Sequence, residues 1–191
     1  MKASIDFYFD FSSPYGYLAS QKIEPLAARH GRSVTWRPML LGAAFKATGA
    51  GPLPSIPLKG EYSKRDFLRS ARFHDVAFRI PDQFPISTLQ ACRAFYATPA
   101  EKRVPLARAL FRAYFADNVN IGEADNVLRI AAALGLKPDL NDQAVKDRTR
   151  AEVDAAIARG VFGSPYVIVD HEPFWGIDRF DQLERWLKAP F

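Results

Sequence analysis

Cysteine is nearly absent from this chain of 191 residues, which holds a single one, Cys92. One cysteine excludes an internal disulfide and a cysteine-rich metal site. The three histidines, His30, His74 and His171, lie far apart and show no metal-ligand spacing, so no metal site is expected. Cys92 falls on an apolar helical pattern, which predicts a buried and inert thiol. This cysteine usage favours a reducing, cytoplasmic setting.

Long apolar runs are lacking as well. No stretch approaches the roughly 20 consecutive apolar residues that span a bilayer. Residues 1–5 pass directly into a strand pattern, which leaves no room for a signal peptide. A phosphate-binding loop is also missing, because residues 49–52 have neither the spacing nor the strand–helix context of one. We therefore expect no membrane partner and no nucleotide chemistry.

Charge of one sign is not concentrated anywhere in the chain. The formal net charge is +5, but lysine and arginine alternate with acidic residues throughout. The densest basic stretch, 59–72, places Lys64, Arg65, Arg69 and Arg72 near helical spacing, which is typical of a solvated helix face. Attraction of small anionic substrates is the alternative for these residues. No motif for nucleic acid accompanies them, so nucleic acid is not an expected partner.

The most informative feature that is present lies at the start of the chain. Residues 4–9 form an apolar, aromatic run typical of a buried strand, and a Ser13-Pro14 step follows. Serine caps helices and proline suits their first turn, so this step predicts the start of a helix. A strand that leads into a helix N-terminus presents a hydroxyl and free N–H groups, which suit an anion or a thiolate. Thioredoxin-like proteins carry Cys-x-x-Cys here, and this chain has Ser13-Pro14-Tyr15-Gly16.

The remaining pattern has a mixed start, a helical middle and a mixed end. A helix ending near Gly31 and a strand over 33–37 follow the first strand, which predicts a right-handed parallel crossover. The Pro/Gly-rich stretch 49–57 predicts a long functional loop. Helices are then expected near 61–75, 88–97, 102–117, 123–134 and 141–158, followed by a strand over 165–169, a second strand leading to Gly176, and a helix over 179–187. This order predicts an α/β protein with a thioredoxin fold, formed by residues 1–41 and 158–191, and an inserted helical domain over 42–157.

Two separated segments carry a resemblance to a known family. They are 6–18 (DFYFDFSSPYGYL) and 160–165 (GVFGSP), the latter followed by 174–179 (FWGIDR). Residues 40–49 (LLGAAFKATG) add to the match. The chain resembles the 2-hydroxychromene-2-carboxylate isomerases, which are similar to kappa-class glutathione transferases and belong to the DsbA-like group. The resemblance implies a glutathione-dependent enzyme, and relatives imply a homodimer.

The resemblance assigns the catalytic role to Ser13, the serine directly before the proline, which would activate the glutathione thiol. A free thiol has a pKa near 8.5, and a helix N-terminus together with a hydroxyl hydrogen bond lowers it. Ser12 is the weaker candidate because it is not adjacent to Pro14. The alternative for Ser13 is a purely structural N-cap.

The second segment supplies the implied glutathione-binding residues. Ser164, before Pro165, resembles a cis-proline turn whose backbone pairs with the cysteinyl part of glutathione, as an added strand would. A proline at the start of a strand is the alternative. The segment Trp175, Gly176, Ile177 and Asp178 resembles the family's other glutathione-binding segment, with Asp178 on the γ-glutamyl ammonium. The alternative for Asp178 is the N-cap of the last helix.

The substrate side rests on fewer residues. Lys46 is a candidate partner for a carboxylate, and Phe84 occupies a position where naphthalene-pathway isomerases carry a tyrosine. Ala50 stands where relatives often carry asparagine. The expected activity is cis-trans isomerisation of a small aromatic keto acid through transient glutathione addition. A kappa-like glutathione transferase and a non-catalytic DsbA-like binding protein are the alternatives.

Overall fold

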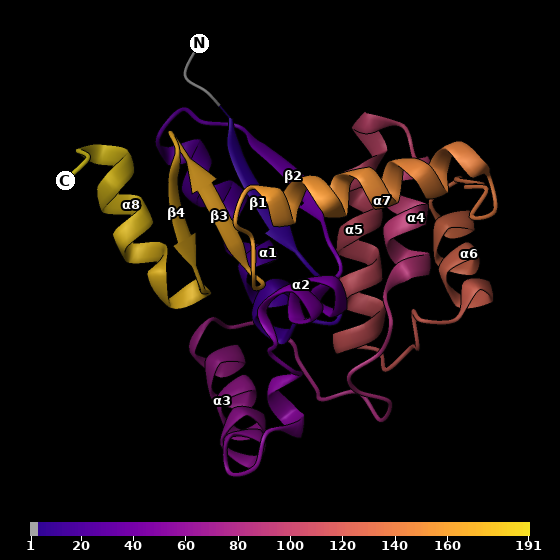
Figure 1. Cartoon of the computed structure of the whole chain (residues 1–191), viewed down its shortest axis with the longest axis horizontal. Helices are drawn as coiled ribbons and strands as arrows, with labels where there is room; N and C mark the ends of the chain where they lie inside the picture. The colour runs from indigo at the N-terminus through magenta and orange to yellow at the C-terminus, as the bar shows by residue number, and fades with distance from the viewer. Residues whose placement is uncertain (1–3) are drawn as a thin grey trace.

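The computed structural model describes residues 4–191, and its centre is a four-stranded sheet with the order β2-β1-β3-β4 (Figure 1). Strand β1 (Ile5–Phe9) pairs in parallel with β2 (Val34–Pro38) and antiparallel with β3 (Tyr166–Val169). Strand β4 (Glu172–Trp175) completes an antiparallel hairpin with β3. Helix α1 (Pro14–Arg29) joins the two parallel strands. The predicted strand–helix–strand start and hairpin end are therefore confirmed.

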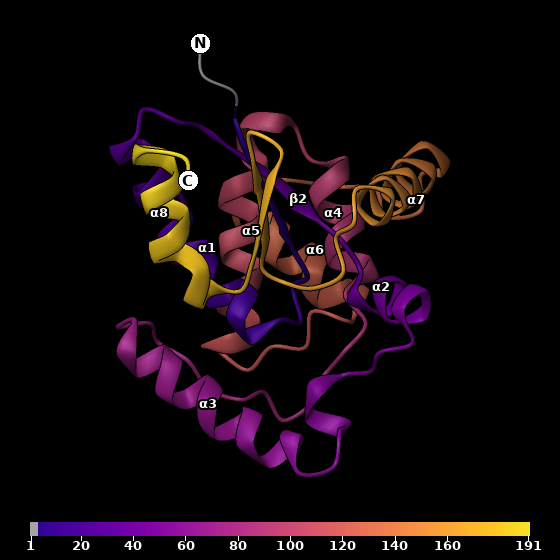
Figure 2. The ribbon, with the colours of Figure 1, turned by 60° about the vertical axis from the view of Figure 1, so that its left-hand side comes forward.

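Helices cover both faces of this sheet, because alternate residues of β1 point to opposite sides. Phe7 and Phe9 belong to the main core, which also includes residues of α1, of α5 (Ala100–Phe115) and of α8 (Phe180–Lys188). Tyr8 faces the other side and packs in a smaller cluster with residues of α2 (Leu41–Thr48) and α7 (Gln143–Ala158). Figure 2 shows the two groups of helices on either side of the strands.

The middle of the chain is helical, as predicted. Its elements are α2, a short 3-10 helix η1 (Leu53–Ser55), α3 (Lys59–Phe73), α4 (Leu89–Ala97), α5, α6 (Ala124–Ala133) and α7. A second 3-10 helix, η2 (Ile177–Arg179), precedes α8. The predicted helices lie within two residues of α3 to α8 at their boundaries. Helix α2 was not predicted, and the Pro/Gly-rich loop contains η1.

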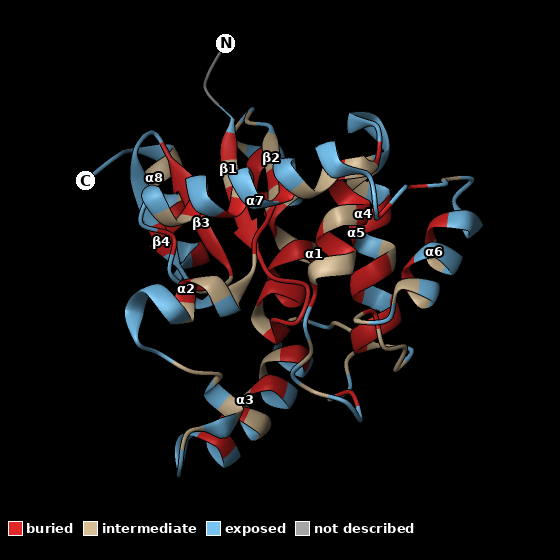
Figure 3. Cartoon of the chain, turned by 45° about the vertical axis from the view of Figure 1, so that its right-hand side comes forward, coloured by how far each residue is buried: buried red, intermediate tan, exposed pale blue. Residues whose placement is uncertain are grey.

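The helical middle shares one core with the sheet. The ring of Phe111 on α5 lies 5.3 Å from that of Phe9 and 5.0 Å from that of Phe11. Phe95, Phe111 and Phe115 are almost fully buried. Figure 3 shows buried residues along β1, β3 and α5. Cys92 is fully buried, as predicted, and burial raises the pKa of its thiol.

Helix α3 lies apart from the other helices, below the sheet edge in the view of Figure 2. Phe67 holds it to the body: this side chain is 2% exposed, and its ring lies 5.1 Å from that of Tyr15 and 6.0 Å from that of Phe84. No helix within residues 4–191 combines the length and apolar character needed to cross a bilayer. The gap between α3 and the sheet contains the cavity described next.

Candidate functional site

A cavity of about 1420 Å³ lies where β1 ends and α1 begins. It extends from η2, past the N-termini of α1 and α2, to α3 and the loop before it. Binding sites for drug-sized ligands have about 300–1,000 Å³. The predicted residues Ser13, Phe84, Ser164 and 175–178 all line this one cavity, although they come from distant parts of the sequence.

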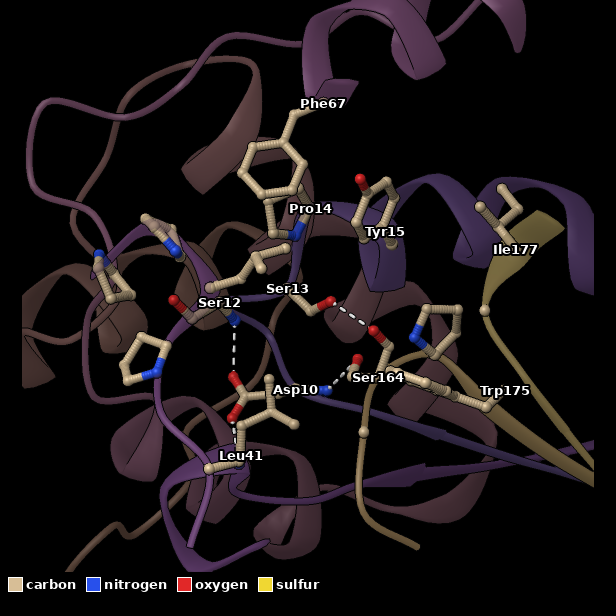
Figure 4. Close-up of a pocket in the computed structure, with 18 of the residues that line it drawn as sticks. Asp10, Ser12, Ser13, Pro14, Tyr15, Leu41, Phe67, Ser164, Trp175 and Ile177 are labelled. Carbon is tan, nitrogen blue, oxygen red and sulfur yellow. Dashed lines mark hydrogen bonds between the residues drawn. The ribbon is translucent and has the colours of Figure 1, made fainter. Parts of the chain in front are cut away.

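Ser13 caps helix α1, as the Ser-Pro step predicted. Its Oγ accepts a hydrogen bond from the Gly16 N–H at 3.0 Å, and its hydroxyl donates to the Ser164 carbonyl oxygen at 3.0 Å (Figure 4). Ser13 is 4% exposed and lines the cavity. The hydroxyl proton of Ser13 is thus directed at the turn before Pro165. Ser12 is engaged elsewhere, because its Oγ accepts from the Ile86 N–H at 3.2 Å.

In the first turn of helix α1, one backbone N–H group has no acceptor among residues 4–191. Pro14 has no N–H, and the N–H groups of Gly16 and Tyr17 both bond to Ser13. Within residues 4–191 the Tyr15 N–H has no hydrogen-bond acceptor. Free N–H groups at a helix N-terminus favour an anion. This turn therefore offers a ligand one amide donor beside the Ser13 hydroxyl.

Asp10 anchors the turn, and the sequence analysis did not single it out. Its carboxylate accepts from the N–H groups of Ser12 and Leu41, both at 2.7 Å, and from the Thr88 hydroxyl at 2.9 Å. Burial raises the pKa of Asp10, and these three hydrogen bonds work against that rise. The only signal in the sequence was a charged residue inside an apolar run. Two of its three partners, Leu41 and Thr88, lie far away in the chain, so a local pattern cannot find them.

Ser164 lies beside Ser13 in the same wall of the cavity. The Ser164-Pro165 peptide bond is cis, as the resemblance implied. The Ser164 Oγ accepts from the Asp10 N–H at 3.0 Å, which fixes the turn to the end of β1. A Cβ on Gly16 would come within 2.7 Å of this Oγ, so glycine is needed at the contact between α1 and the turn. A second cis bond, Phe84-Pro85, was not predicted.

Trp175 stands beside the same turn. Its ring packs against Phe162 with 4.8 Å between centroids, yet the residue remains 56% exposed. A Cβ on Gly163 would overlap the Trp175 Nε1, so Gly163 permits this packing. The indole thus forms an accessible edge of the cavity.

Asp178 is exposed at the rim and forms an ion pair with Arg179 at 3.2 Å. The alternative that Asp178 caps the last helix is wrong. Gly176 is the N-cap of η2 and Arg179 that of α8, and neither cap uses a side-chain hydrogen bond. Gly176 has φ of 103°, and a Cβ there would overlap the Asp178 Oδ1. Glycine therefore lets the chain turn while the Asp178 carboxylate stays close to the cavity.

The opposite wall is aromatic. The Tyr15 hydroxyl donates to the Asp66 carboxylate on α3, and Phe84 packs on Phe67. Burial, followed by the interaction with Asp66, raises the pKa of Tyr15, so this hydroxyl stays protonated at neutral pH. His74, at the end of α3, also lines the cavity, and burial lowers its pKa below 6.5. Sequence reasoning missed His74, because only the fold of α3 brings it here.

Lys46 is not brought to the site. It lies on α2, is exposed and does not line the cavity, whereas Phe45 and Ala50 do. The basic residues of 59–72 do not line it either: α3 presents Tyr62, Asp66 and Phe67 to the cavity. Arg69 lies behind this lining and hydrogen-bonds to Tyr62 and Asp66. No cluster of metal-ligating side chains occurs in the part of the chain that the structure describes.

Comparison with known proteins agrees with this geometry. A family model described as a DSBA-like thioredoxin domain matches residues 4–188. A 2-hydroxychromene-2-carboxylate isomerase of Sphingobium xenophagum is 32% identical, over 98% of this chain and 99% of its own length. The chain belongs to this isomerase family, within the DSBA-like thioredoxin proteins.

The chain is also similar to a solved isomerase structure and to a kappa-class transferase. The solved structure of a 2-hydroxychromene-2-carboxylate isomerase superposes with a TM-score of 0.85 at 28% identity, covering 96% of this chain and 94% of the other. Glutathione S-transferase kappa 2 of Caenorhabditis elegans is 26% identical over 98% of this chain and 92% of its own length. This isomerase-family member is therefore related along its whole length to two groups of enzymes.

Proposed function

We propose that this protein is a glutathione-dependent isomerase and that Ser13 holds the glutathione sulfur as a thiolate. The observation that carries the proposal is the Ser13 hydroxyl at a helix N-terminus, in the lining of a large cavity and at the position where thioredoxin-like proteins carry a Cys-x-x-Cys motif. The cysteinyl N–H of glutathione would bond to the Ser164 carbonyl and replace the Ser13 hydroxyl as its donor. That hydroxyl, with the Tyr15 N–H, then turns to the sulfur.

The rest of glutathione fits the same wall. Asp178 provides a carboxylate for the γ-glutamyl ammonium, and the N–H groups at the start of η2 and α8 suit its carboxylate. Trp175 and Ile177 provide the flanking surface. The proposed setting is a reducing, cytoplasmic one, and the proposed assembly is a homodimer.

The reaction uses the thiolate as a reversible nucleophile. Its sulfur attacks the electron-poor carbon of a carbon–carbon double bond conjugated to the carbonyl of an aromatic keto acid, and the π electrons move to the carbonyl oxygen. The former double bond rotates as a single bond. When the enolate electrons return, the carbon–sulfur bond breaks and glutathione is released unchanged. The geometry of the double bond is the only change.

The variant Ser13→Ala tests the proposal. Alanine removes the hydroxyl donor, so the pKa of bound glutathione should rise by about one unit or more, and turnover should fall with it. Ser12→Ala is the matched control, since the Ser12 hydroxyl is bonded to Ile86. The ultraviolet absorbance of the thiolate during pH titration gives the pKa, and circular dichroism checks folding. Unchanged turnover in a folded Ser13→Ala protein would refute the mechanism.

A kappa-like glutathione transferase is the second candidate, because a relative of that group matches the whole chain. The two functions differ in the fate of glutathione. A transferase consumes one thiol for each product molecule, whereas an isomerase leaves the thiol concentration constant. Thiol titration during turnover distinguishes them.

A further inference from the structure

The cavity lining offers few partners to the carboxylate of a keto acid, which needs hydrogen-bond donors when it leaves water. Lys46, the candidate that the resemblance suggested, is exposed and lies outside the lining. Arg179 lines the cavity but is paired with Asp178 on the proposed glutathione side. Burial lowers the pKa of His74, so this side chain is uncharged at neutral pH. The carboxylate of the proposed substrate therefore needs another partner.

Helix α3 presents a hydroxyl group whose proton is available to a ligand. Tyr62 lines the cavity and is 61% exposed. Its oxygen accepts a hydrogen bond from Nη2 of Arg69 at 3.0 Å, and its own proton has no acceptor in the described part of the chain. The hydroxyls of Tyr15 and Ser70, by contrast, both donate to Asp66. The Tyr62 hydroxyl is therefore able to donate to a bound carboxylate.

Arg69 holds Tyr62 from behind the cavity lining. Its guanidinium carbon lies 5.5 Å from the centre of the Tyr62 ring, in addition to the hydrogen bond to the hydroxyl. A hydroxyl that accepts a hydrogen bond from a cation becomes a stronger donor, because hydrogen bonds in a chain polarise one another. Arg69 thus fixes the direction of the Tyr62 hydroxyl and strengthens it as a donor.

Asp66 does not use up the hydrogen-bonding capacity of Arg69. Its carboxylate accepts from Tyr15, Arg69 and Ser70, so its own acceptor positions are largely occupied. Burial disfavours the charged form of Asp66, but the hydrogen bonds from Tyr15 and Arg69 outweigh it and lower its pKa. The ion pair adds no net charge. A preference for an acid on this wall therefore comes from the direction of the Tyr62 and Arg69 donors.

The position of Tyr62 suits a substrate that reaches the thiolate. Tyr62 and Asp66 are four residues apart on α3 and so share one face of the helix. Asp66 bonds to Tyr15, which follows Ser13 by two residues at the start of α1. Phe67 adds an aromatic surface beside them in the cavity lining. One wall thus provides a polar site for an acid and a flat surface for a ring.

We propose that Tyr62 and Arg69 recognise the carboxylate of the aromatic keto acid, with the Tyr62 hydroxyl as the donor and Arg69 as the residue that positions it. This inference rests on the proposed function for the reaction, and it adds the residues that select an acid. A hydrogen bond to a charged group is about twice as strong as one between neutral groups. A neutral ketone of the same shape should therefore depend much less on Tyr62.

A matched pair of saturated ligands tests the inference by binding alone. Benzylpyruvate and benzylacetone differ in a carboxylate against a methyl group, and neither has a carbon–carbon double bond for glutathione to attack. In calorimetry with glutathione-loaded protein, Tyr62→Phe should weaken benzylpyruvate binding by roughly fivefold or more and benzylacetone binding by less than about twofold. Loss of a merely structural contact would weaken both ligands alike. An equal effect on the two ligands, or none on benzylpyruvate, overturns the inference.

Arg69→Gln tests the positioning role. It should selectively weaken benzylpyruvate binding, whereas Arg65→Gln, which removes the same charge from an exposed position of α3 outside the lining, should not. If Arg69 acts through Tyr62, the double variant should lose less affinity than the product of the two single losses. An equal effect of Arg65→Gln would show a general influence of charge, and independent losses would show that Arg69 does not act through Tyr62. Either result overturns the role proposed for Arg69.

Lys46→Ala completes the test and should leave the affinity for both ligands unchanged. A selective loss of benzylpyruvate binding in this variant would assign the acid to Lys46 and overturn the inference. Failure of the proposed function gives a different result: the protein then binds no glutathione, or does not isomerise benzylidenepyruvate in its presence. The ligand pair can still be measured without glutathione, and the effect of Tyr62→Phe on the two affinities still decides whether Tyr62 recognises the carboxylate.

Discussion

The two walls of the cavity are built in different ways. The wall with Ser13, Ser164 and η2 presents backbone groups and short polar side chains that sheet ends, helix caps and glycines hold in place. The wall with Phe67 and Phe84 presents large side chains on a helix and loops that touch the body at few points. If glutathione binds to the first wall and the substrate to the second, as the proposed function requires, a substitution in one wall should weaken the binding of one ligand only.

Of the substitutions that test the difference between the two walls, Phe67→Ala should have the largest effect. Removing a buried phenylalanine costs about 3–5 kcal/mol, and here the loss falls on the contact between α3 and the body. We expect faster proteolysis within 49–87 and weakened aromatic-ligand binding, with glutathione binding retained. Leu68→Ala is the control, because Leu68 also lies on α3 but is 37% exposed and does not line the cavity. An equal loss of affinity for glutathione and for the aromatic ligand would show that the two walls are not independent.

Gly163→Ala should affect the other wall, by a smaller amount. The new Cβ would overlap the Trp175 ring, and overpacking of this kind costs roughly 1–3 kcal/mol. Glutathione affinity should fall and tryptophan fluorescence should change, while aromatic-ligand binding persists. Gly42→Ala is the matched control, since a Cβ at Gly42 would have no neighbouring atom within 4 Å. An unaltered glutathione affinity would remove Trp175 and its turn from the proposed site.

The smallest expected effect is on the pH dependence of protein stability, and it arises from the contact between Tyr15 and Asp66. The pKa of Asp66 lies below its ordinary value of 3.8, so its charged form stabilises the fold above that value and the contribution is lost as the pH falls below it. Asp66→Asn should therefore destabilise the protein at neutral pH, by about 1 kcal/mol or less, and by less in acid. Urea unfolding at both pH values measures this. If Asp66→Asn lowers the free energy of unfolding equally at both pH values, Asp66 acts through packing and not through charge.

The sequence was sufficient where a structure depends on neighbouring residues. Ser13 and Pro14 specify a cap and a first turn by themselves, and the apolar periods specify most helices. Asp10 was not singled out because two of its three hydrogen-bond partners, at positions 41 and 88, are distant in the chain. Helix α2 was not predicted because it is short and begins at Leu41 without a side-chain cap. Its position depends on tertiary contacts, such as that of Ala44 with the cluster around Tyr8.

The substrate wall was the least predictable part. A lysine next to a phenylalanine in the sequence carries no information about which of them faces a cavity. The structure places Phe45 in the lining and leaves Lys46 outside. In α3, likewise, the basic residues dominate the sequence while an aromatic and acidic stripe faces inward. The direction of a helix face depends on packing, and the contacts of α3 are few and distant in sequence.

The burial of Cys92 has a consequence for the reaction of this chain with oxidants. Its thiol is the sole thiol in the sequence, has a raised pKa and donates to the Met39 carbonyl at 3.8 Å. A native chain therefore has no accessible sulfur with which to form a mixed disulfide. If the proposed use of glutathione holds, oxidants would affect activity through the supply of reduced glutathione and not through a disulfide on the protein itself.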